Sequence, residues 1–440
     1  MFHNRRTILA GLAATAASPL FATTPTNPDV VIVGAGAAGL SAGQELRRRG
    51  ISFVIVEAAD RVGGRAWTES VSFGQPVDHG CSWINRSNRN PVTDLARNGG
   101  FTLVNHTHAD TDLFDINGRR AGQQDQDQIR SAWDAVANSV SEAGQSGYDI
   151  PASHVVSDIP YAATVRTWLG AMDYGMDFDQ ISTRDYWDSD DDQPSHFVRE
   201  GLGTVIARQA EGLPIRLGTQ VTAVDWSGSG VSVETSAGTI RARACVLTVS
   251  VGVLASGAIR FTPALPPDQQ QAVSDIPMGL LVKIPLLFDG ARLGLGENNW
   301  VTYRVPEDQP GRACYAVAWP CGWDYLMGFV GGRFTWELWR DGQGAVVDFA
   351  LEQLVRLLGS DVKRHFVKGF ATDWADNPLT RGAYGAVRPG AYGAREILGR
   401  PVGRRVFIAG EAVAGSRSAL VNGAWISGRK TAQKVAKMLR

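Results

Sequence analysis

The sequence is poor in several residue types, and each shortage excludes a class of protein. Four cysteines occur among 440 residues, and none has the spacing of a zinc site or a CxxC redox pair. The histidines of "NHTHAD", His106 and His108, lie in a polar loop where imidazoles are usually solvated, so we expect no metal. The formal net charge of −1 lacks the basic excess of a nucleic-acid-binding protein.

The cysteines leave one structural question open. An oxidising compartment would permit a disulfide between Cys314 and Cys321. Scattered cysteines with apolar neighbours are more often buried thiols, which is the alternative for all four of them.

Long apolar runs are also missing, apart from a weakly apolar stretch near the N-terminus. "HNRRTILAGLAATAASPLFA" contains the twin arginines Arg5 and Arg6, then an alanine-rich run without acidic residues that ends near Ala22. This pattern is typical of a bacterial twin-arginine export signal, and a disordered tail or a transit peptide is the alternative. We assign residues 1–28 to a signal peptide and linker, and expect a soluble, periplasmic protein without stable membrane insertion.

Glycine, in contrast, is abundant, with 50 residues. In "DVVIVGAGAAGL" an apolar β-branched run leads directly into Gly34, Gly36 and Gly39, which are spaced as GxGxxG. "SAGQELRRRG" then predicts a helix, and "SFVIVE" predicts a second strand that ends at Glu57. This βαβ unit predicts dinucleotide binding. Its glycines permit a tight turn and close approach to a pyrophosphate, and its glutamate can accept the hydroxyls of an adenosine ribose.

A second glycine cluster decides between NAD and FAD. "DRVGGRAWT" follows Glu57 closely, so Gly64 and Arg65 should lie beside the same pyrophosphate. This arrangement is similar to the glycine doublet of flavoproteins with two dinucleotide-binding domains, and NAD enzymes generally lack it. We therefore predict FAD.

Four further segments fit an FAD-binding fold that is split along the chain. They are "PVDHGCSWINRSNRNPVTDLAR" (76–97), the strand-rich 215–254, "DIPMGLLVKIPLLFD" (275–289) and the helix-containing 404–439. The predicted fold class is mixed α/β, with a discontinuous Rossmann-type FAD-binding domain and a substrate-binding domain of mixed sheet and helices. We assign residues 29–84, 205–258 and 400–440 to the first domain, and 85–204 and 259–399 to the second.

With these segments in place, the chain resembles the flavin-containing amine oxidases, which include monoamine oxidases, polyamine oxidases and related bacterial enzymes. The likeness spans nearly all of residues 29–440 and is weakest between Thr102 and Glu200. The resemblance implies that FAD is bound by Gly34, Gly36, Ala38, Gly39, Glu57, Gly64, Arg65, Gly80, Cys81, Ser82, Trp83, Val221, Trp374, Gly410, Glu411, Leu420, Val421 and Ala424.

Some of these residues receive a particular role from the resemblance. The backbone of Val221 should contact the adenine, and Glu411 should hydrogen-bond the ribityl or phosphate part of FAD. "NGAWISG" should begin a helix that points its N-terminus at the isoalloxazine C2=O edge, where reduced flavin carries negative charge. Ala383 stands where some family members carry a cysteine bound to flavin, so we predict non-covalent FAD.

The resemblance also implies the reaction, which is the FAD-dependent oxidation of an amine. A hydride equivalent leaves the carbon next to the amine nitrogen for the flavin, the imine hydrolyses to a carbonyl product, and oxygen or a periplasmic electron acceptor reoxidises the cofactor. The catalytic candidates are Lys283, which stands alone in the apolar "GLLVKIPLLF", and Tyr384, one ring of an aromatic pair that holds the amine. A lysine that extends from an edge strand to solvent, and a core tyrosine, are the alternatives.

The second ring of that pair should precede "NGA", where this chain has Leu420, so the pair is either incomplete or completed from elsewhere by another aromatic such as Trp425 or Trp323. An L-amino-acid oxidase is an alternative function and would need an arginine for the substrate carboxylate, such as Arg388 or Arg417. A non-catalytic flavin-binding protein is a third reading. The acidic "RDYWDSDDDQP" (184–194) is either a solvated loop or a source of carboxylates for a cationic amine. The sequence names neither the amine nor the oligomeric state, which could be a homodimer.

Overall fold

The fold begins with a parallel sheet whose strands come from four distant parts of the chain. The computed structural model describes residues 21–115, 117–189 and 193–440. The predicted βαβ unit is present, because β1 and β2 pair in parallel and α1 (Ala37–Arg48) connects them. All neighbouring strands in this sheet are parallel. Their order is β22 (Val406–Ile408), β13 (Ala244–Leu247), β1 (Val30–Val33), β2 (Phe53–Val56) and β9 (Ile215–Arg216).

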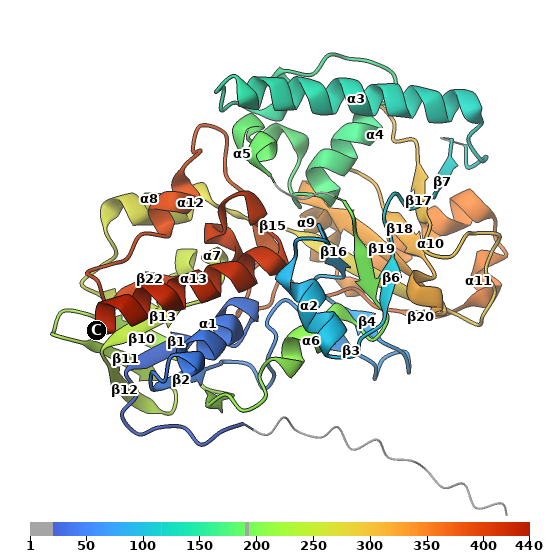
Figure 1. Ribbon diagram of the computed structural model, residues 1–440. Coiled ribbons are helices and arrows are strands. Elements are labelled where there is room, and N and C mark those ends of the chain that lie inside the picture. Colours follow the sequence, from blue (N-terminus) through green and yellow to red (C-terminus); the bar gives the residue numbers. More distant parts are fainter. Residues whose placement is uncertain (1–20, 116, 190–192) are drawn as a thin grey trace, which may run out of the picture.

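Along each strand of the parallel sheet, side chains point alternately to one face and the other, and both faces are apolar. Val30 and Ile32 pack toward the helices, and Val31 and Val33 pack toward a second sheet. Figure 1 shows α1 and the C-terminal α13 side by side on the first face. Together with α13 (Val421–Leu439), helices α2 (Pro91–Asn98) and α6 (Leu202–Arg208) pack on this face.

A four-stranded sheet covers the other face of the parallel sheet. Its antiparallel strands β10 to β12 form a meander, and β14 pairs in parallel with β10. Three short helices complete this core. The elements are β10 (Val221–Asp225), β11 (Val231–Thr235), β12 (Gly238–Ala242), β14 (Arg260–Thr262), α7 (Val251–Ala255), α8 (Pro267–Asp275) and α12 (Ala394–Leu398).

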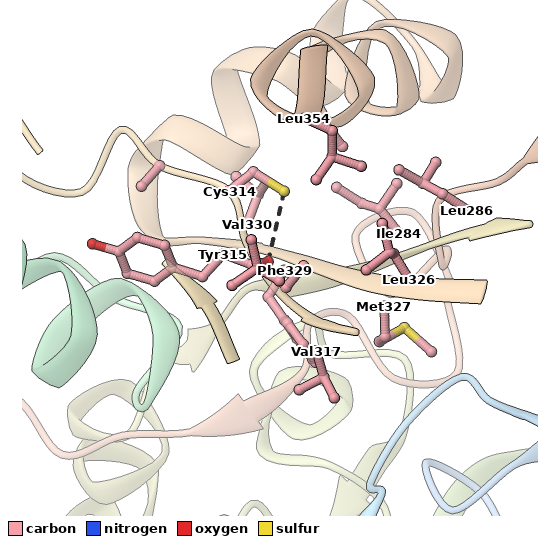
Figure 2. Packing of buried hydrophobic residues seen from close by; sticks show 14 of the residues in the cluster. Ile284, Leu286, Cys314, Tyr315, Val317, Leu326, Met327, Phe329, Val330 and Leu354 are labelled. Atoms are coloured by element: carbon pink, nitrogen blue, oxygen red, sulfur yellow. Dashed lines mark hydrogen bonds between the residues drawn. The ribbon is translucent and has the colours of Figure 1, made fainter. Parts of the chain in front are cut away.

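A six-stranded, mostly antiparallel sheet forms the largest core of the molecule. Figure 2 shows this core, in which Ile284 and Leu326 of the sheet face Leu354 of α10. Helices α9 (Gly332–Arg340), α10 (Gln343–Leu358) and α11 (Val362–His365) accompany the sheet. The strand order is β20 (Phe366–Gly369), β16 (Leu281–Phe288), β19 (Tyr325–Gly331), β18 (Tyr315–Ala318), β17 (Trp300–Tyr303) and β7 (Thr111–Phe114).

The same core answers the question of the disulfide. Cys314 is a buried free thiol, and its Sγ contacts the carbonyl oxygen of Tyr315 at 3.7 Å (Figure 2). Cys321 is also free and lies in a separate 3₁₀ turn, Pro320–Gly322. The permitted disulfide is therefore absent, and the alternative of buried thiols holds for this pair.

Helices from the middle of the chain cover one end of the six-stranded sheet. The long α3 (Gln123–Gln145) runs across the top of the view in Figure 1, with α4 (Ala162–Thr167) and α5 (Thr183–Asp188) against it. A π-helical turn, Trp168–Met172, continues α4. Such turns are rare and often mark functional sites, because the extra residue redirects the side chains that follow.

Short strands connect these layers. They are β3 (Thr68–Glu69), β4 (Val77–Asp78), β5 (Trp83–Ile84), β6 (Leu103–Asn105), β8 (His196–Val198), β15 (Met278–Gly279) and β21 (Tyr384–Gly385). None of the helices in the described ranges combines the length and apolarity that a bilayer crossing requires. The predicted signal peptide lies almost wholly outside the described residues, and the domain boundaries stay a prediction.

Candidate active site

One large cavity runs from the glycine turn after β1 to the helices α3 and α5. Its volume is about 1790 Å³, well above the usual size of a pocket for a single small ligand. Of the residues that the sequence predicted for the cofactor and for catalysis, all line this cavity except Gly39. The structure therefore brings these distant segments together around one space.

The glycine turn combines close packing on one side with open space on the other. Gly34 has φ +104°, and a Cβ on Gly39 would lie 1.9 Å from the carbonyl oxygen of Gly34, so Gly39 acts in helix–strand packing. A Cβ on Gly36 would meet nothing closer than 3.8 Å. The second cluster lies alongside, since the Gly63 N–H donates to Ala35 O at 2.9 Å. The chain thus leaves room for a ligand at Gly36, as the GxGxxG spacing predicts.

Glu57 holds this turn in place. Its Oε2 accepts from the Ala35 N–H at 2.7 Å and its Oε1 accepts from the Ala59 N–H at 2.9 Å. Nearby, Arg61 donates to Gly64 O at 2.8 Å and lies over the Trp67 ring at 4.2 Å. Burial lowers the pKa of Arg61 below its usual value, and the charge of Glu57 offsets this shift only in part. We did not predict Arg61 as a site residue, although it stands in the same "DRVGGRAWT" segment.

Two helix N-termini reach the same cavity. α1 begins after Gly36 and α13 begins after Leu420, and neither has a side-chain cap or an acidic residue in its first turn. Each leaves backbone N–H groups and the positive end of its dipole for a ligand. This pair of donor sets fits FAD, whose diphosphate and electron-rich flavin ring both favour such positions.

Two ion pairs hold the backbone on either side of Tyr384. Arg65 pairs with Glu411 at 2.9 Å and donates to Ala383 O at 2.8 Å, and Glu411 accepts from the Gly385 N–H at 3.3 Å. The Tyr384 hydroxyl itself donates to Met172 O, at 3.3 Å, in the π-helical turn. Glu411, expected at the ribityl or phosphate part of FAD, therefore also fixes the Tyr384 strand.

The second pair, Asp185 and Arg395, is fully internal. Arg395 Nε and Nη2 donate to the two carboxylate oxygens of Asp185 at 3.1 and 3.0 Å. Arg395 also donates to Gly385 O at 3.1 Å and to Ala412 O at 3.2 Å. The pair therefore ties α5 to the Tyr384 strand and to the loop that follows Glu411.

Lys283 is buried in the wall of the cavity. It lies on β16 between β20 and β19 and is 5% exposed, so the alternative of a side chain that extends to solvent from an edge strand does not apply. Its Nζ donates to Ser82 Oγ and, at 3.3 Å, to Asp78 O. Burial lowers the pKa of Lys283 to about 8, although the Asp78 carboxylate opposes this shift. A proton can therefore leave this amine near neutral pH.

The end of the cavity near Lys283 is lined by aromatic rings. Lys283 Nζ is 5.6 Å from the centroid of Trp83 and 5.8 Å from that of Phe329. Trp300 stacks on Trp83 with centroids 5.6 Å apart, and Trp168 meets Trp300 edge-on at 4.8 Å. The sequence reasoning missed Trp168, Trp300 and Phe329, because no local pattern connects them.

The two residues expected to replace the second ring of the aromatic pair are elsewhere. Trp425 is 5% exposed and packs in the core beneath α13, and Trp323 stacks on Arg199 outside the main cavity. Neither residue therefore fills the place of the second ring, and the alternative of an incomplete pair stays a prediction. Trp374 does line the cavity, where its Nε1 donates to His79 O at 2.9 Å. Leu420 lines it also, so aliphatic surface stands where a ring was expected.

The remaining candidates also have clear positions. His106 Nε2 bonds to Asn298 O at 2.9 Å, and its Nδ1 accepts from Trp83 Nε1 at 3.1 Å, so both ring nitrogens are engaged. Within the described residues no group of three potential metal ligands occurs. Neither Arg388 nor Arg417 lines the cavity. The acidic stretch 184–194 lies partly outside the described residues, and its Tyr186, Trp187 and Ser189 reach the cavity.

Comparisons with known proteins agree with this geometry. The family model described as flavin containing amine oxidoreductase matches residues 37–177 and 178–436. The chain is 28% identical to the human lysine-specific histone demethylase 2 over 93% of its own length, and spans about half (53%) of that protein. It is 26% identical to polyamine oxidase 4 of rice, with 94% of this chain and 89% of the relative covered.

Solved structures show the same fold. Putrescine oxidase with bound putrescine superimposes with a TM-score of 0.79, at 20% sequence identity, over 93% of this chain and 99% of the other. The predicted mixed α/β class with a Rossmann-type FAD-binding fold is therefore confirmed. The family match confirms the FAD cofactor and the class of reaction, FAD-dependent amine oxidation, and does not favour the two alternatives. The chain belongs to the family of flavin-containing amine oxidoreductases.

Proposed function

We propose that this chain oxidises a C–N bond of a small aliphatic amine, such as the names polyamine oxidase and putrescine oxidase denote, with Lys283 and Tyr384 as its catalytic residues. The observation that carries the proposal is a buried lysine in the same cavity as a glycine turn open to a dinucleotide. A buried amine is costly even beside the Asp78 carboxylate, so a function is the better explanation for it. Bound FAD supplies an acceptor for the two electrons of the C–N bond.

The residues of the chain supply orientation and proton control. Tyr384 presents its ring to the amine and excludes water, and its hydrogen bond to Met172 O fixes the ring. Lys283 holds a water for imine hydrolysis or for the reaction with oxygen, and Ser82 orients its Nζ. Because burial brings the pKa of Lys283 to about 8, a neutral fraction is present that can accept a proton.

We also propose the roles assigned to the cofactor-binding residues. The N-termini of α1 and α13 stabilise the diphosphate and the reduced flavin ring, and Glu57 holds the ribose. With alanine at 383, FAD is held without a covalent bond. The proposed domains keep the boundaries given above, with FAD on residues 29–84, 205–258 and 400–440.

The location and the electron acceptor are further parts of the proposal. The twin arginines at 5 and 6 support export of the folded, FAD-loaded protein to the periplasm. Oxygen, with release of hydrogen peroxide, or a periplasmic acceptor then reoxidises the enzyme. Fractionation of cells that express the full chain, compared with an R5K/R6K variant, tests this part, and signal peptide cleavage in both would contradict it.

The experiment for the reaction is anaerobic reduction. Purified holoenzyme is mixed with a panel of aliphatic amines and L-amino acids, and the absorption band of oxidised flavin is followed. Bleaching by amines alone is the expected result. Bleaching by amino acids alone, or by nothing in the panel, would contradict the proposal. A second run with oxygen or a cytochrome identifies the acceptor.

A further inference from the structure

A second, much smaller cavity adjoins the main one near Lys283, and we call it the small cavity. Its volume is about 20 Å³, which is enough for one water molecule. Ser82, Trp83 and Phe329 line both cavities and form the wall between them. The two oxygens that accept from Lys283 Nζ are Ser82 Oγ and Asp78 O, and both belong to residues that line the small cavity. The lysine amine is therefore one residue away from a space that the main cavity does not include.

Polar residues line the small cavity, as a bound water requires. Ser82 and Asp78 lie on the side of Lys283, and Arg199 and Cys321 are further parts of the wall. Because Ser82 Oγ accepts from Lys283, its own hydrogen points elsewhere, and the described residues offer this hydrogen no acceptor. A water molecule in the small cavity would accept it.

Arg199 connects the small cavity to solvent. This residue lines the small cavity and is itself exposed. Its Nη1 donates to Cys321 O at 2.5 Å, and its guanidinium lies over the Trp323 ring at 4.5 Å. Cys321 has φ +58°, a left-handed conformation that is uncommon for residues other than glycine. A single layer of side chains therefore separates the small cavity from solvent.

A neighbouring void shows what a simple packing defect looks like in this molecule. It measures about 10 Å³, lies in the six-stranded core and is lined by aliphatic residues, glycine and Cys314. An apolar void of this kind stays dry, because a water in it would lack hydrogen-bond partners. The small cavity differs in its charged and hydroxyl groups. The two voids lie on opposite faces of β18, since Ala316 lines the apolar void and Val317 lines the small cavity.

We propose that Ser82 and a water in the small cavity carry protons between Lys283 and solvent, along a route that does not cross the substrate. This inference rests on the proposed function and concerns the same lysine. An aliphatic amine is an ammonium ion at neutral pH, and it must lose one N–H proton before its carbon can give up a hydride equivalent. FAD and substrate fill the main cavity at that moment, so the proton needs another exit.

The transfer is a series of bond exchanges in which no electrons change owner. The proton of the substrate binds to neutral Lys283 Nζ. One Nζ–H bond then breaks as Ser82 Oγ gains a proton and gives its own hydrogen to the water, which releases a proton to solvent beside Arg199. Lysine, serine and water end as they began. The Asp78 carboxylate stabilises the positive charge at the inner side, and Glu200 lies close enough to Arg199 to offset its charge.

The test follows flavin reduction in Ser82→Ala and Ser82→Thr. Each holoenzyme is mixed without oxygen with the fastest amine of the panel, in H₂O and in D₂O. Ser82→Ala should slow reduction by at least about tenfold, and should raise the solvent isotope effect because proton transfer becomes the slow step. Ser82→Thr keeps the hydroxyl and should restore most of the rate. An unchanged rate in Ser82→Ala, or a slower rate with an unchanged isotope effect, would overturn the inference.

Two neighbouring positions on β18 provide a matched pair that leaves Ser82 in place. Val317→Ile adds a methylene group at the small cavity, where it should displace the water, slow reduction and raise the isotope effect. Ala316→Val adds two methyl groups at the apolar void on the other face of the strand and should change neither. Melting of both variants checks that each is folded. Equal rates and isotope effects in the two variants would contradict the route.

A reaction without amine separates this inference from the proposed function. Holoenzyme that has been reduced by light is mixed with oxygen, and anionic reduced flavin, oxygen and one proton give oxidised flavin and hydrogen peroxide. The proton enters along the same route, so Ser82→Ala should slow this step and Ser82→Thr should restore it. If it does while no amine bleaches the flavin, the proposed function fails and the route stands. Bleaching by amines with the wild-type rate and isotope effect in Ser82→Ala would refute the route alone.

Discussion

The two ends of the cavity are built in different ways. At the cofactor end, backbone N–H groups of α1 and α13 and the turn at Gly36 face the ligand, and most of these parts lie in one continuous segment. At the end near Lys283, side chains of Trp83, Trp168 and Trp300 line the cavity, and each comes from a different element. A diphosphate binds to backbone donors, which a local motif can encode, whereas an amine tail needs a surface that only the tertiary fold assembles.

The first comparison separates packing from ligand contact within the glycine turn. Gly36→Ala should fold with nearly the stability of the wild-type apoprotein, because its Cβ would make only ordinary contacts, and should weaken FAD binding by at least about a hundredfold. Gly39→Ala should lose both stability and FAD, because its Cβ would lie 1.9 Å from Gly34 O. FAD titration and apoprotein melting check both variants. Full FAD binding in Gly36→Ala would place the diphosphate elsewhere.

The next effect concerns the internal ion pair of Asp185 and Arg395. Asp185→Asn leaves Arg395 buried without its bidentate partner and should lower the free energy of unfolding by about 3–5 kcal/mol. The control is Asp268→Asn, which breaks an ion pair with Arg400 whose partners are both half-exposed and should cost about 0–1 kcal/mol. Denaturant melts of both variants test this difference. Similar losses in the two variants would contradict the role of the internal pair.

A smaller effect is expected at Lys283. Lys283→Met should slow turnover or reoxidation by more than about tenfold, with FAD retained. The wild-type rate should change with an apparent pKa near 8, and this inflection should be missing from the variant. Rates at several pH values after rapid mixing with amine measure both effects. An unchanged rate and pH profile would remove the catalytic role.

The free energy of unfolding should also depend on the protonation of Lys283. Burial lowers the pKa of Lys283 from 10.5 to about 8, so the unfolded chain holds more protons between these values. The free energy of unfolding of the wild type should therefore rise across this window relative to Lys283→Met, because the penalty for the buried charge is relieved. Denaturant melts at pH 7 and pH 10 compare the two proteins. A constant difference would contradict the assigned environment.

The smallest effect is expected at Tyr384. Tyr384→Phe keeps the ring and loses the hydroxyl that donates to Met172 O at 3.3 Å, so it should cost about 1 kcal/mol or less in catalysis. Tyr384→Ala removes the ring and should cost more. Values of kcat and KM for one amine with each variant provide the comparison, and equal losses would show that the hydroxyl, not the ring, is the important group.

The contrast between the ends also explains what could be predicted from the sequence. The βαβ unit and the apolar strand that holds Lys283 follow from periodicity and spacing over short segments. The rotation of α13 about its axis does not follow from such patterns. It directs Trp425 into the core, although the sequence reasoning had expected its ring at the site. Trp168 depends on a π-helical turn, which no propensity indicates, and Trp300 depends on the pairing of β17 with β7.

Arg61, at the cofactor end, is a second residue whose contacts could not be predicted from the sequence. It stands four residues from Arg65, and both line the cavity, yet the spacing alone did not show which arginine would meet Glu411 and which would lie over Trp67. Contacts between side chains depend on the rotamers that packing selects, and these are set only in the folded chain.

The central claim is that one cavity holds FAD at its glycine end and an amine at its tryptophan end. The most direct test is a crystal structure of the holoenzyme with dodecyltrimethylammonium bound. We expect the diphosphate at Gly36 and the ammonium group between Lys283 and Tyr384. Flavin outside this cavity, or an ammonium group far from Lys283, would contradict the account.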